Sequence, residues 1–386
     1  MEDIKRVKLS EIVELITKGT TPTTLGYEFQ DEGVNFLKIE CFDENGGFIE
    51  SKVAHISEEC HKKMKRSQLK NGDILFSIAG AIGRVAIVTE EMLPANINQA
   101  LAIIRISDEQ VYLPYIKLIL TSPIVIEQFE RKKQGVAQLN LSLKDINEIS
   151  IPLPSKDKQI ELAELFDKVV GVISKRNKEL SALDDLIKAR FVEMFGDPAT
   201  NPYNWDKINI SEVVGDKVSN GFFAKRDDYA DDGNVSVMGV AYIVNRMYSQ
   251  WQDLPRTNGT DKDIEKFEVK YGDMLFCRSS LVAEGIGKAS IVPEDVPQNT
   301  LFECHVIRLP LDLSKCVPEY MQVFSTMEYF RRQIIAQSKT ATMTTIGQDG
   351  ILKADILLPP MSKQREFYAF VHQVNKSKVT VQKAFE

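Results

Sequence analysis

The longest regular pattern in the chain is a stripe of apolar residues between positions 157 and 195. Its positions are spaced alternately by four and three residues, two of them are arginines, Arg176 and Arg190, and the stretch contains no proline and one glycine, Gly171. Prolines at 152 and 154 precede it, and Gly-Asp-Pro at 196–198 follows it. An apolar repeat of about 3.5 residues keeps one face turned toward a partner helix, so the pattern predicts one continuous coiled-coil helix over 157–195. At about 1.5 Å per residue this helix is roughly 55–60 Å long, which suits a spacer.

A shorter copy of the stripe lies near the C-terminus. Leu-Pro-Ser-Lys-Asp-Lys-Gln at 153–159 resembles Leu-Pro-Pro-Met-Ser-Lys-Gln at 358–364, and this alignment places a second set of apolar residues on the same helix face. We expect the two helices to pack as an antiparallel coiled coil. The residues expected to form the helix–helix contact are Leu162, Phe166, Val169, Ile173, Leu180, Leu183 and Ile187 in the first helix, and Phe367, Val371, Val374, Val381 and Phe385 in the second.

The repeat extends beyond the helices. Gly-Asp-Ile-Leu-Phe at 72–76 matches Gly-Asp-Met-Leu-Phe at 272–276, and Ile-Gly-Arg at 82–84 matches Ile-Gly-Lys at 286–288. The offset grows from 200 to 204, so the second copy carries four extra residues between these motifs. A repeat of about 200 residues is too long for a solenoid unit and indicates a duplicated domain with its linker.

Within each copy, short β-branched runs alternate with glycine and aspartate turns. In the first copy they predict strands at 73–76, 85–88 and 101–106. Helical spacing predicts helices over 114–133 and 318–338. We therefore expect an α/β fold with two similar globular domains, each with a curved, mostly antiparallel sheet, separated by the long helices. The expected segments are a first domain over 1–150, the central helix over 151–198, a second domain over 199–355 and the C-terminal helix over 356–386.

Composition limits the classes of protein that fit. A chain of 386 residues is long enough for two domains, and no apolar run approaches the ~18 residues of a membrane span. The charged start at 1–6 lacks the apolar core of a signal peptide. Five scattered cysteines with no Cys-x-x-Cys pair predict a reducing cytoplasm and no zinc site. The net charge of −7 argues mildly against a nucleic-acid partner, unless basic residues gather on one face or a partner subunit supplies positive charge.

No catalytic motif is complete in the sequence. A phosphate-binding loop and a dinucleotide fingerprint are both missing, and four histidines offer no Ser/His/Asp spacing. Asn-Pro-Tyr-Asn-Trp at 201–205 resembles the adenine-methyltransferase motif but lacks its second proline. These joint absences in a duplicated chain favour a binding function. Two similar domains related by an approximate two-fold would suit duplex DNA, which has local two-fold axes, and their differing sequences predict two different half-sites.

The order and duplication of the motifs resemble the specificity subunit of a type I restriction-modification system over essentially the full chain. The resemblance is carried by the repeated Gly-Asp-Ile/Met-Leu-Phe and Ile-Gly-Arg/Lys motifs, by Gln-Leu-Asn-Leu-Ser at 138–142 and by Phe-Gly-Asp-Pro at 195–198. The chain departs from the pattern in its short C-terminal helix and in Met-Thr-Thr-Ile at 343–346, which replaces Leu-Asn-Leu-Ser.

This resemblance implies a non-catalytic cytoplasmic subunit of a prokaryotic host-defence complex. It implies two target recognition domains and two conserved helical regions that together recognise an asymmetric bipartite DNA sequence. The implied partners are double-stranded DNA, two methyltransferase subunits and ATP-driven restriction subunits. S-adenosylmethionine, ATP and Mg would be bound by those partners, and the chain itself would hold no cofactor and no metal.

Polar loops between the strands are the expected DNA contacts, because short polar and forked side chains read base edges and phosphates. For any one loop, a plain surface turn is an equal alternative. The residues expected in the first domain are Lys18, Thr20, Thr21, Thr23, Ser77, Arg84, Asn96, Asn98, Gln99, Lys133, Gln138 and Asn140. Those expected in the second domain are Ser219, Asn220, Lys225, Arg226, Arg278, Ser279, Ser280, Lys288, Gln298, Asn299, Lys339, Thr342 and Thr344.

Two other classes of function remain open from the sequence. A coiled-coil scaffold with two protein-interaction domains would show no salt-dependent DNA binding. An enzyme with an unrecognised site would transfer methyl groups from S-adenosylmethionine without any partner.

Overall fold

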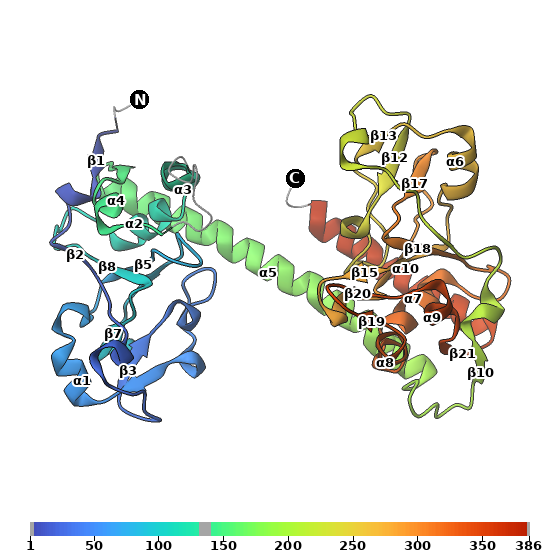
Figure 1. Ribbon diagram of the computed structural model, residues 1–386, viewed down its shortest axis with the longest axis horizontal. Coiled ribbons are helices and arrows are strands. Elements are labelled where there is room, and N and C mark those ends of the chain that lie inside the picture. The colour runs from blue at the N-terminus through green and yellow to red at the C-terminus, as the bar shows by residue number, and fades with distance from the viewer. Residues whose placement is uncertain (1–3, 131–139, 384–386) are drawn as a thin grey trace. The chain divides into compact units, whose positions relative to one another are not determined.

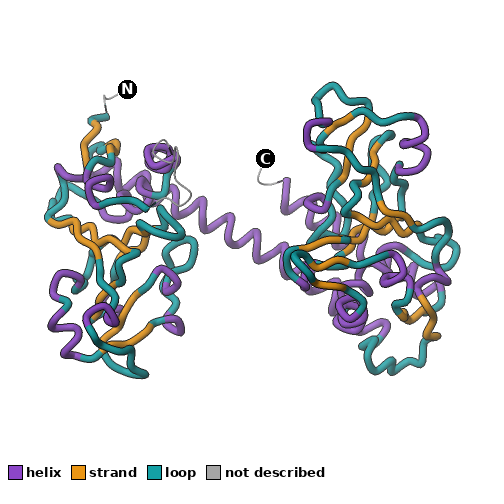
Figure 2. The backbone as a smooth tube through the Cα atoms, viewed as in Figure 1, coloured by secondary structure: helices purple, strands orange, loops and turns teal. Residues whose placement is uncertain are grey.

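A computed structural model describes residues 4–130 and 140–383 of the chain. The chain divides into two compact units, of which unit 1 ends at Ile173 and unit 2 begins at Ser174. Helices and strands are mixed in both units, as Figure 2 shows, so the expected α/β class is confirmed. No helix in the described part of the chain is long and apolar enough to cross a membrane.

Unit 1 is built on a four-stranded antiparallel sheet and a three-stranded mixed sheet (Figure 1). The four-stranded sheet has the order β2 (Leu15–Lys18), β8 (Leu101–Arg105), β5 (Ile74–Ser77) and β6 (Val85–Ile87). The three-stranded sheet has the order β4 (Ala54–Ile56), β3 (Val34–Leu37) and β7 (Ala95–Ile97), with β3 and β7 parallel. A further pair joins β1 (Arg6–Lys8) to β9 (Ser150–Pro152). The three strands expected from the sequence are confirmed.

Side chains of the central strands alternate between the two faces of the four-stranded sheet, and each face packs against a different hydrophobic core. Ile74 and Phe76 pack with the helices α2 (Leu113–Leu120) and α3 (Pro123–Glu130), whereas Leu75 packs toward the three-stranded sheet. Successive side chains of a strand point to opposite faces, so a strand buried on both sides is apolar at most positions. The remaining helices of this unit are α1 (Glu58–Lys63), α4 (Leu143–Asn147) and the 3-10 helices η1 (Leu9–Glu11), η2 (Pro22–Leu25), η3 (Ile39–Cys41), η4 (Glu50–Lys52), η5 (Lys65–Ser67) and η6 (Glu90–Met92).

Unit 2 repeats the same sheets in the same order. Its four-stranded sheet runs β11 (Ser219–Asn220), β18 (Val306–Pro310), β14 (Asp273–Cys277) and β16 (Ala289–Ile291). Its three-stranded sheet runs β13 (Arg256–Thr257), β12 (Val235–Met238) and β17 (Thr300–Phe302), again with one parallel pair. The pair β10 (Asp206–Asn209) with β21 (Asp355–Leu358) repeats β1 with β9. The duplication read from the sequence is therefore also a duplication of strand order and direction.

Each of the two helices expected at the end of a domain is divided in the structure. The first breaks after α2 at Thr121–Ser122, because the residue before Pro123 is disfavoured in helical conformation, and the expected helical residues 131–133 lie outside the described chain. The second divides into α7 (Pro318–Thr326) and α8 (Glu328–Ala336) at Met327, which is extended although no proline follows it. Unit 2 also contains α6 (Asp261–Phe267), α9 (Gln348–Leu352), η7 (Ile210–Val213), η8 (Arg226–Asp228), η9 (Val240–Tyr242) and η10 (Ala283–Gly285).

Two buried glutamines tie the long helices to the units on which they begin. These helices are α5 (Lys156–Phe195) and α10 (Met361–Lys383). Near the start of α5, Gln159 accepts the N–H of Tyr112 at 2.9 Å and donates to the carbonyls of Gln110 and Pro154. Gln364 of α10 likewise accepts the N–H of Val317 at 2.8 Å and donates to the carbonyls of Lys315 and Pro359. The repeated Lys-Gln motif is therefore a structural clamp on the chain that precedes α2 or α7.

Within unit 2, α10 packs on the second half of α5 and runs in the opposite direction. The Phe367 ring lies 5.6 Å from Phe191 and 5.5 Å from Phe195, between ring centroids. Further along α10, Lys378 forms an ion pair with Asp184, which precedes Phe191 in α5. The two helices therefore run in opposite directions. This segment of the expected antiparallel contact is present, and it includes Leu183, Ile187, Val371 and Val374.

The rest of the expected helix–helix stripe does not pack in this way. The side chains of Phe166, Val169 and Ile173 are 47%, 47% and 42% exposed, so the prediction is wrong for these three within the described chain. Leu162 packs against the core of unit 1, Leu180 and Val381 are half-buried, and Phe385 lies outside the described residues. In the described chain α5 spans 40 residues and α10 spans 23.

Because these side chains of the stripe are exposed, we expect polar substitutions there to have a small effect on the free energy of unfolding. Replacing Phe166 and Val169 with serine changes the free energy of unfolding by less than about 1 kcal/mol, because both side chains already contact water. Urea denaturation of the full chain measures this, with Phe191→Ala as the buried control that loses about 3–5 kcal/mol. A loss of several kcal/mol in the serine variant would show that the stripe is packed.

Candidate functional site

In unit 1, three of the predicted contact segments meet where β2 and β5 end and β6 and β8 begin. We call this the reading end of the four-stranded sheet. The N–H of Gly19 donates to the carbonyl of Leu101 at 3.3 Å, and the hydroxyl of Thr21 donates to the side-chain oxygen of Gln99. The N–H of Leu141 donates to the carbonyl of Ile78 at 3.0 Å, which brings the exposed Asn140 to the same end. The structure therefore gathers Lys18, Thr20, Thr21, Thr23, Asn98, Gln99 and Asn140.

A glycine makes this close approach possible in both units. A Cβ on Gly19 would lie 2.0 Å from the carbonyl oxygen of Ile97, and one on Gly221 would lie 2.2 Å from that of Phe302. Any side chain there would push the loop away from the turn that precedes β8 or β18. The loop after the first sheet strand is thus held against the same turn in both copies.

Two of the predicted contact residues in unit 1 are buried, and their side chains form hydrogen bonds within the unit. Asn96 donates to the carbonyl of Met64 at 3.0 Å and to the hydroxyl of Ser67 at 2.9 Å, and its side chain is 0% exposed. Ser77 is also 0% exposed and donates to the carbonyl of Ala79. Neither side chain reaches the surface, so neither is a contact residue in this structure. Arg84 is half-buried and donates to the carbonyl of Phe42, and Lys133 and Gln138 lie outside the described residues.

Unit 2 adds a small hydroxyl-rich sheet at the equivalent end. Its strands are β15 (Ser279–Ser280), β20 (Thr344–Thr345) and β19 (Lys339–Thr340), in that order. The four residues inserted between the repeated motifs make room for β15. Lys339 and Thr342 are exposed, whereas Thr344 is 1% exposed and its hydroxyl pairs with that of Thr340. The structure thus brings together the Ser279–Ser280 and Lys339–Thr344 predictions but buries Thr344.

The loop after β11 brings basic residues to the same unit. Lys225 and Arg226 are exposed at the start of η8, and Ser219 and Asn220 are half-buried on β11. Two large apolar side chains that sequence reasoning missed are exposed in this unit, namely Phe223 at 68% in the loop after β11 and Leu281 at 81% after β15. Each of them stands beside a second apolar residue, Phe222 or Val282, in an otherwise polar loop.

Three predicted contacts in unit 2 belong elsewhere. Parallel pairing aligns Phe36 with Asn96 and Val237 with Leu301. Gln298 and Asn299 therefore precede β17, whereas Asn98 and Gln99 follow β7, so the two pairs of residues do not occupy equivalent positions. The N–H of Asn299 instead donates to Glu268 at 2.8 Å. Lys288 donates to the side-chain oxygen of Asn245 at 2.7 Å and lines a separate cavity.

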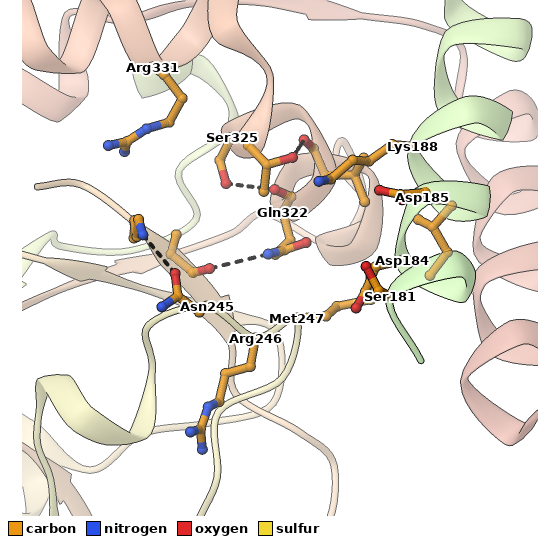
Figure 3. Close-up of a pocket in the computed structure, with 15 residues that line it drawn as sticks. Ser181, Asp184, Asp185, Lys188, Asn245, Arg246, Met247, Gln322, Ser325 and Arg331 are labelled. Atoms are coloured by element: carbon orange, nitrogen blue, oxygen red, sulfur yellow. Dashed lines mark hydrogen bonds between the residues drawn. The ribbon is translucent and has the colours of Figure 1, made fainter. Parts of the chain in front are cut away.

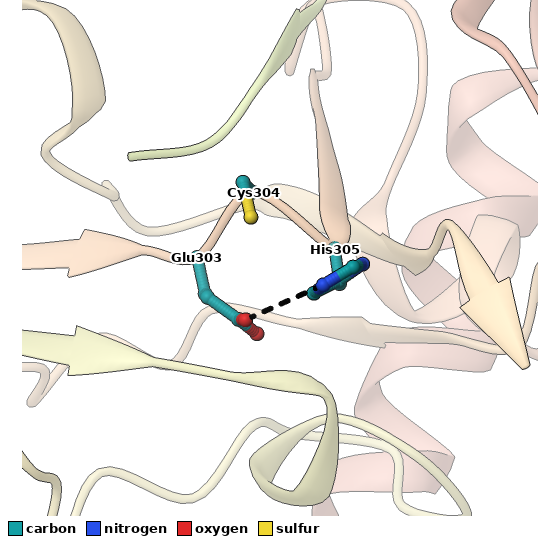
Figure 4. Close-up of side chains that lie close together, drawn as sticks. All are labelled: Glu303, Cys304 and His305. Carbon is teal, nitrogen blue, oxygen red and sulfur yellow. Dashed lines mark ion pairs between the residues drawn. The ribbon is translucent and has the colours of Figure 1, made fainter. Parts of the chain in front are cut away.

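The true counterpart of Asn98–Gln99 is a turn that sequence reasoning passed over. The N–H of Val306 donates to the carbonyl of Glu303 at 2.9 Å, which closes a turn with Cys304 and His305 at its tip (Figure 4). Arg278 braces this turn, because its backbone N–H donates to the carbonyl of His305 at 2.8 Å and its guanidinium to that of Cys304 at 3.1 Å. Arg278 is therefore held in the site by the backbone of the turn. Alignment of β7 with β17, rather than of polar residues, would have found it.

A cavity of about 440 Å³ in unit 2 lies apart from the reading end. Figure 3 shows Asp184, Asp185 and Lys188 at its wall on α5, with Gln322 and Ser325 from α7. Burial lowers the pKa of Arg331, which also lines it. Lys288 is the only predicted DNA contact in its described lining, so the cavity does not gather the predicted site.

Residues 1–182 match a family model described as the type I restriction modification DNA specificity domain. The EcoBI specificity subunit of Escherichia coli is 31% identical over 48% of this chain and 39% of that protein. The MjaIX specificity subunit of Methanocaldococcus jannaschii is 20% identical over 99% of this chain and 88% of that protein. The chain thus spans about two fifths of the EcoBI relative but most of the MjaIX relative.

Solved structures show the same fold at low sequence identity. A chain from a type I R-M system has a TM-score of 0.53 and 16% identity, and the alignment covers 98% of this chain and 92% of that one. A type I restriction-modification S subunit from M. genitalium has a TM-score of 0.50 and 12% identity, with coverage of 100% and 93%. At these identities the likeness concerns the fold alone.

Proposed function

From the premise that residues 1–182 belong to the type I restriction modification DNA specificity domain family, we propose that the whole chain is the DNA-specificity subunit of such a complex. In this proposal it recognises an asymmetric bipartite sequence and positions methyltransferase and restriction subunits without catalysing a reaction itself. The two units act as two target recognition domains, and the long helices, packed as an antiparallel coiled coil, separate them.

The observation that carries the proposal is the duplicated reading end with different side chains. Gly19 and Gly221 hold equivalent loops against equivalent turns, yet the turns read Asn-Gln-Ala at 98–100 and Glu-Cys-His at 303–305. Base edges are distinguished by the donors and acceptors that approach them. Two copies of one scaffold with different polar groups therefore suit two different half-sites.

Within each unit, phosphate and base contacts would be divided by side-chain type. The exposed cations Lys18, Lys225, Arg226 and Lys339 suit phosphates, which fix position without reading sequence. The exposed hydroxyls and amides around them suit base edges. A chain of net charge −7 has little general attraction for DNA, so partner subunits would supply part of the positive charge.

The proposed partners also account for an exposed surface on α5. Leu165, Phe166, Val169, Val172 and Ile173 are each more than 40% exposed and lie within nine residues of helix. A contiguous apolar stripe on a soluble protein indicates a protein interface. In the proposed assembly methyltransferase subunits cover such surfaces and bind S-adenosylmethionine, while restriction subunits bind ATP and Mg.

Removal of one exposed cation tests the reading end directly. The Lys339→Ala variant, assembled with the chain's methyltransferase partner, binds DNA fragments that carry the methylated sequence about 3- to 10-fold more weakly and with a shallower salt dependence, because one phosphate contact is lost. Fluorescence anisotropy over a salt series measures both quantities. Lys262→Ala is the matched control, since Lys262 is exposed on α6 in the same unit. An equal loss in both variants, or no salt-dependent DNA binding by the assembly, contradicts the proposal and favours the protein scaffold.

A further inference from the structure

The turn at the reading end of unit 2 presents three consecutive side chains of metal-binding type. The carboxylate of Glu303, the thiol of Cys304 and the ring nitrogen of His305 converge, with their ligand atoms all within 4.8 Å of one another. Figure 4 shows the carboxylate and the imidazole facing each other, and Glu303 Oε1 lies 4.0 Å from His305 Nε2. Four-coordinate zinc with bonds of about 2.0–2.3 Å needs ligand separations of about 3.3–3.8 Å, so small side-chain rotations suffice.

The backbone of the turn is already fixed in the shape that such a site needs. Val306 closes the turn onto Glu303, and Arg278 holds the carbonyls of both Cys304 and His305. A metal site gains affinity when its ligands need little reorganisation on binding. The Glu303–His305 turn therefore presents its three ligands from a braced backbone rather than from a free loop.

A second contact orients the histidine ring. His305 Nδ1 lies 3.1 Å from the hydroxyl of Ser279, which leaves Nε2 facing Glu303. Metal-bound histidines almost always use the second ring nitrogen in a hydrogen bond that fixes the tautomer. Ser279 fills that role here, and it does so from the neighbouring strand β15.

We propose that Glu303, Cys304 and His305 form a zinc-type transition-metal site with at least one coordination position left open. One sulfur, one nitrogen and one oxygen ligand suit a borderline-soft divalent ion and do not suit calcium or magnesium, which take oxygen ligands. The sequence-based expectation of no zinc site rested on Cys-x-x-Cys spacing, which a contiguous Glu-Cys-His turn does not follow. The proposal stands whether or not the chain binds DNA.

The site distinguishes the two units. The equivalent turn in unit 1 carries Asn98, Gln99 and Ala100, which offer neither thiol nor imidazole. A bound dication would place positive charge among the proposed contacts of one unit and leave the other unchanged.

Cobalt titration of the chelator-treated full chain tests the proposal. One equivalent of Co²⁺ should produce a thiolate-to-cobalt charge-transfer band, and Zn²⁺ should displace it. The Cys304→Ser variant should lose the band, and His305→Gln should weaken binding by at least the roughly 10- to 100-fold that loss of a ligand's hydrogen-bond partner costs, while the thiol remains. His372→Gln is the control, because His372 is an exposed histidine on α10.

A thiol-protection assay gives an independent result. Cys41, Cys60, Cys277 and Cys316 are buried, so a thiol reagent reacts first with the partly exposed Cys304. Zinc should slow that reaction in the wild type and in His372→Gln but not in His305→Gln. Absence of the cobalt band, a band that persists in Cys304→Ser, or binding that is equal in wild type and His305→Gln marks an adventitious ion only and overturns the proposal. Unchanged circular dichroism of the variants excludes unfolding as the cause.

Discussion

Replacing Gln364 with leucine lowers the free energy of unfolding of unit 2 by about 3–4 kcal/mol, because it removes the three hydrogen bonds of a buried side chain and leaves a buried backbone N–H without its partner. The side chain is 0% exposed and joins α10 to the N–H of Val317 and to two carbonyls. Leucine fills nearly the same volume, so the loss comes from the unpaired polar groups rather than from a cavity. Both tryptophans, Trp205 and Trp251, belong to unit 2, so tryptophan fluorescence during urea denaturation reports this transition.

Two further variants test whether the effect is specific to the buried glutamines. Gln159→Leu breaks the equivalent clamp in unit 1, and its effect should appear as faster hydrogen exchange at Tyr112 rather than in tryptophan fluorescence. Gln373→Leu changes an exposed glutamine of α10 and should stay within about 0.5 kcal/mol of wild type. If Gln364→Leu and Gln373→Leu had the same small effect, the repeated glutamine would not be a clamp.

Replacing Asp73 with asparagine costs about 3–5 kcal/mol of unit 1 stability, because it leaves the partner arginine without its counter-charge. Asp73 and Arg105 form a two-point ion pair with both contacts at 2.7 Å, and Asp73 is 1% exposed. The matched pair in unit 2 is looser, since Arg308 reaches Asp273 at 3.9 Å. Asp273→Asn should therefore stay within about 1 kcal/mol of wild type at neutral pH. Equal losses in the two variants would contradict this difference.

The Asp273 pair also predicts a dependence of stability on pH. Burial raises the pKa of Asp273 from 3.8 to about 6, although Arg308 acts against it. A folded-state pKa above the unfolded value contributes stability that is complete below about pH 3.8 and is lost as pH rises through about 6. That difference in pKa corresponds to about 3 kcal/mol. From pH 4 to pH 7, the difference in free energy of unfolding between Asp273→Asn and wild type should therefore shift in favour of the variant by up to this amount. Urea denaturation at each pH measures this shift. A constant difference would refute the assignment.

The duplication, the long helix and the central strands could be predicted because each has a local signature. Strands β5 and β14 are apolar at nearly every position, since both of their faces are covered, and glycine and aspartate mark where they begin. The α5 helix contains no proline and ends before a glycine. These features depend on neighbours in sequence, so the sequence alone predicts them.

The candidate site was predicted less completely because burial and register depend on residues far apart in the chain. Asn96 looks like a surface amide, but three groups from residues 61–67 enclose it. Gln298 resembles Asn96 in residue type. The parallel pairing of β12 with β17 shows instead that Glu303 is the structural equivalent of Asn98. Phe166 fits a coiled-coil repeat but is exposed, because the repeat alone does not show which of its positions a partner helix covers.

Mapping methylated adenines in cells that express this chain with its methyltransferase partner tests the central claim most directly. We expect a two-part motif with an unspecified gap, and exchange of the 303–305 turn for the Asn-Gln-Ala of unit 1 should alter one half of the motif and leave the other intact. A contiguous motif, or methylation that does not change when either turn is altered, would contradict the assignment of one reading end to each unit.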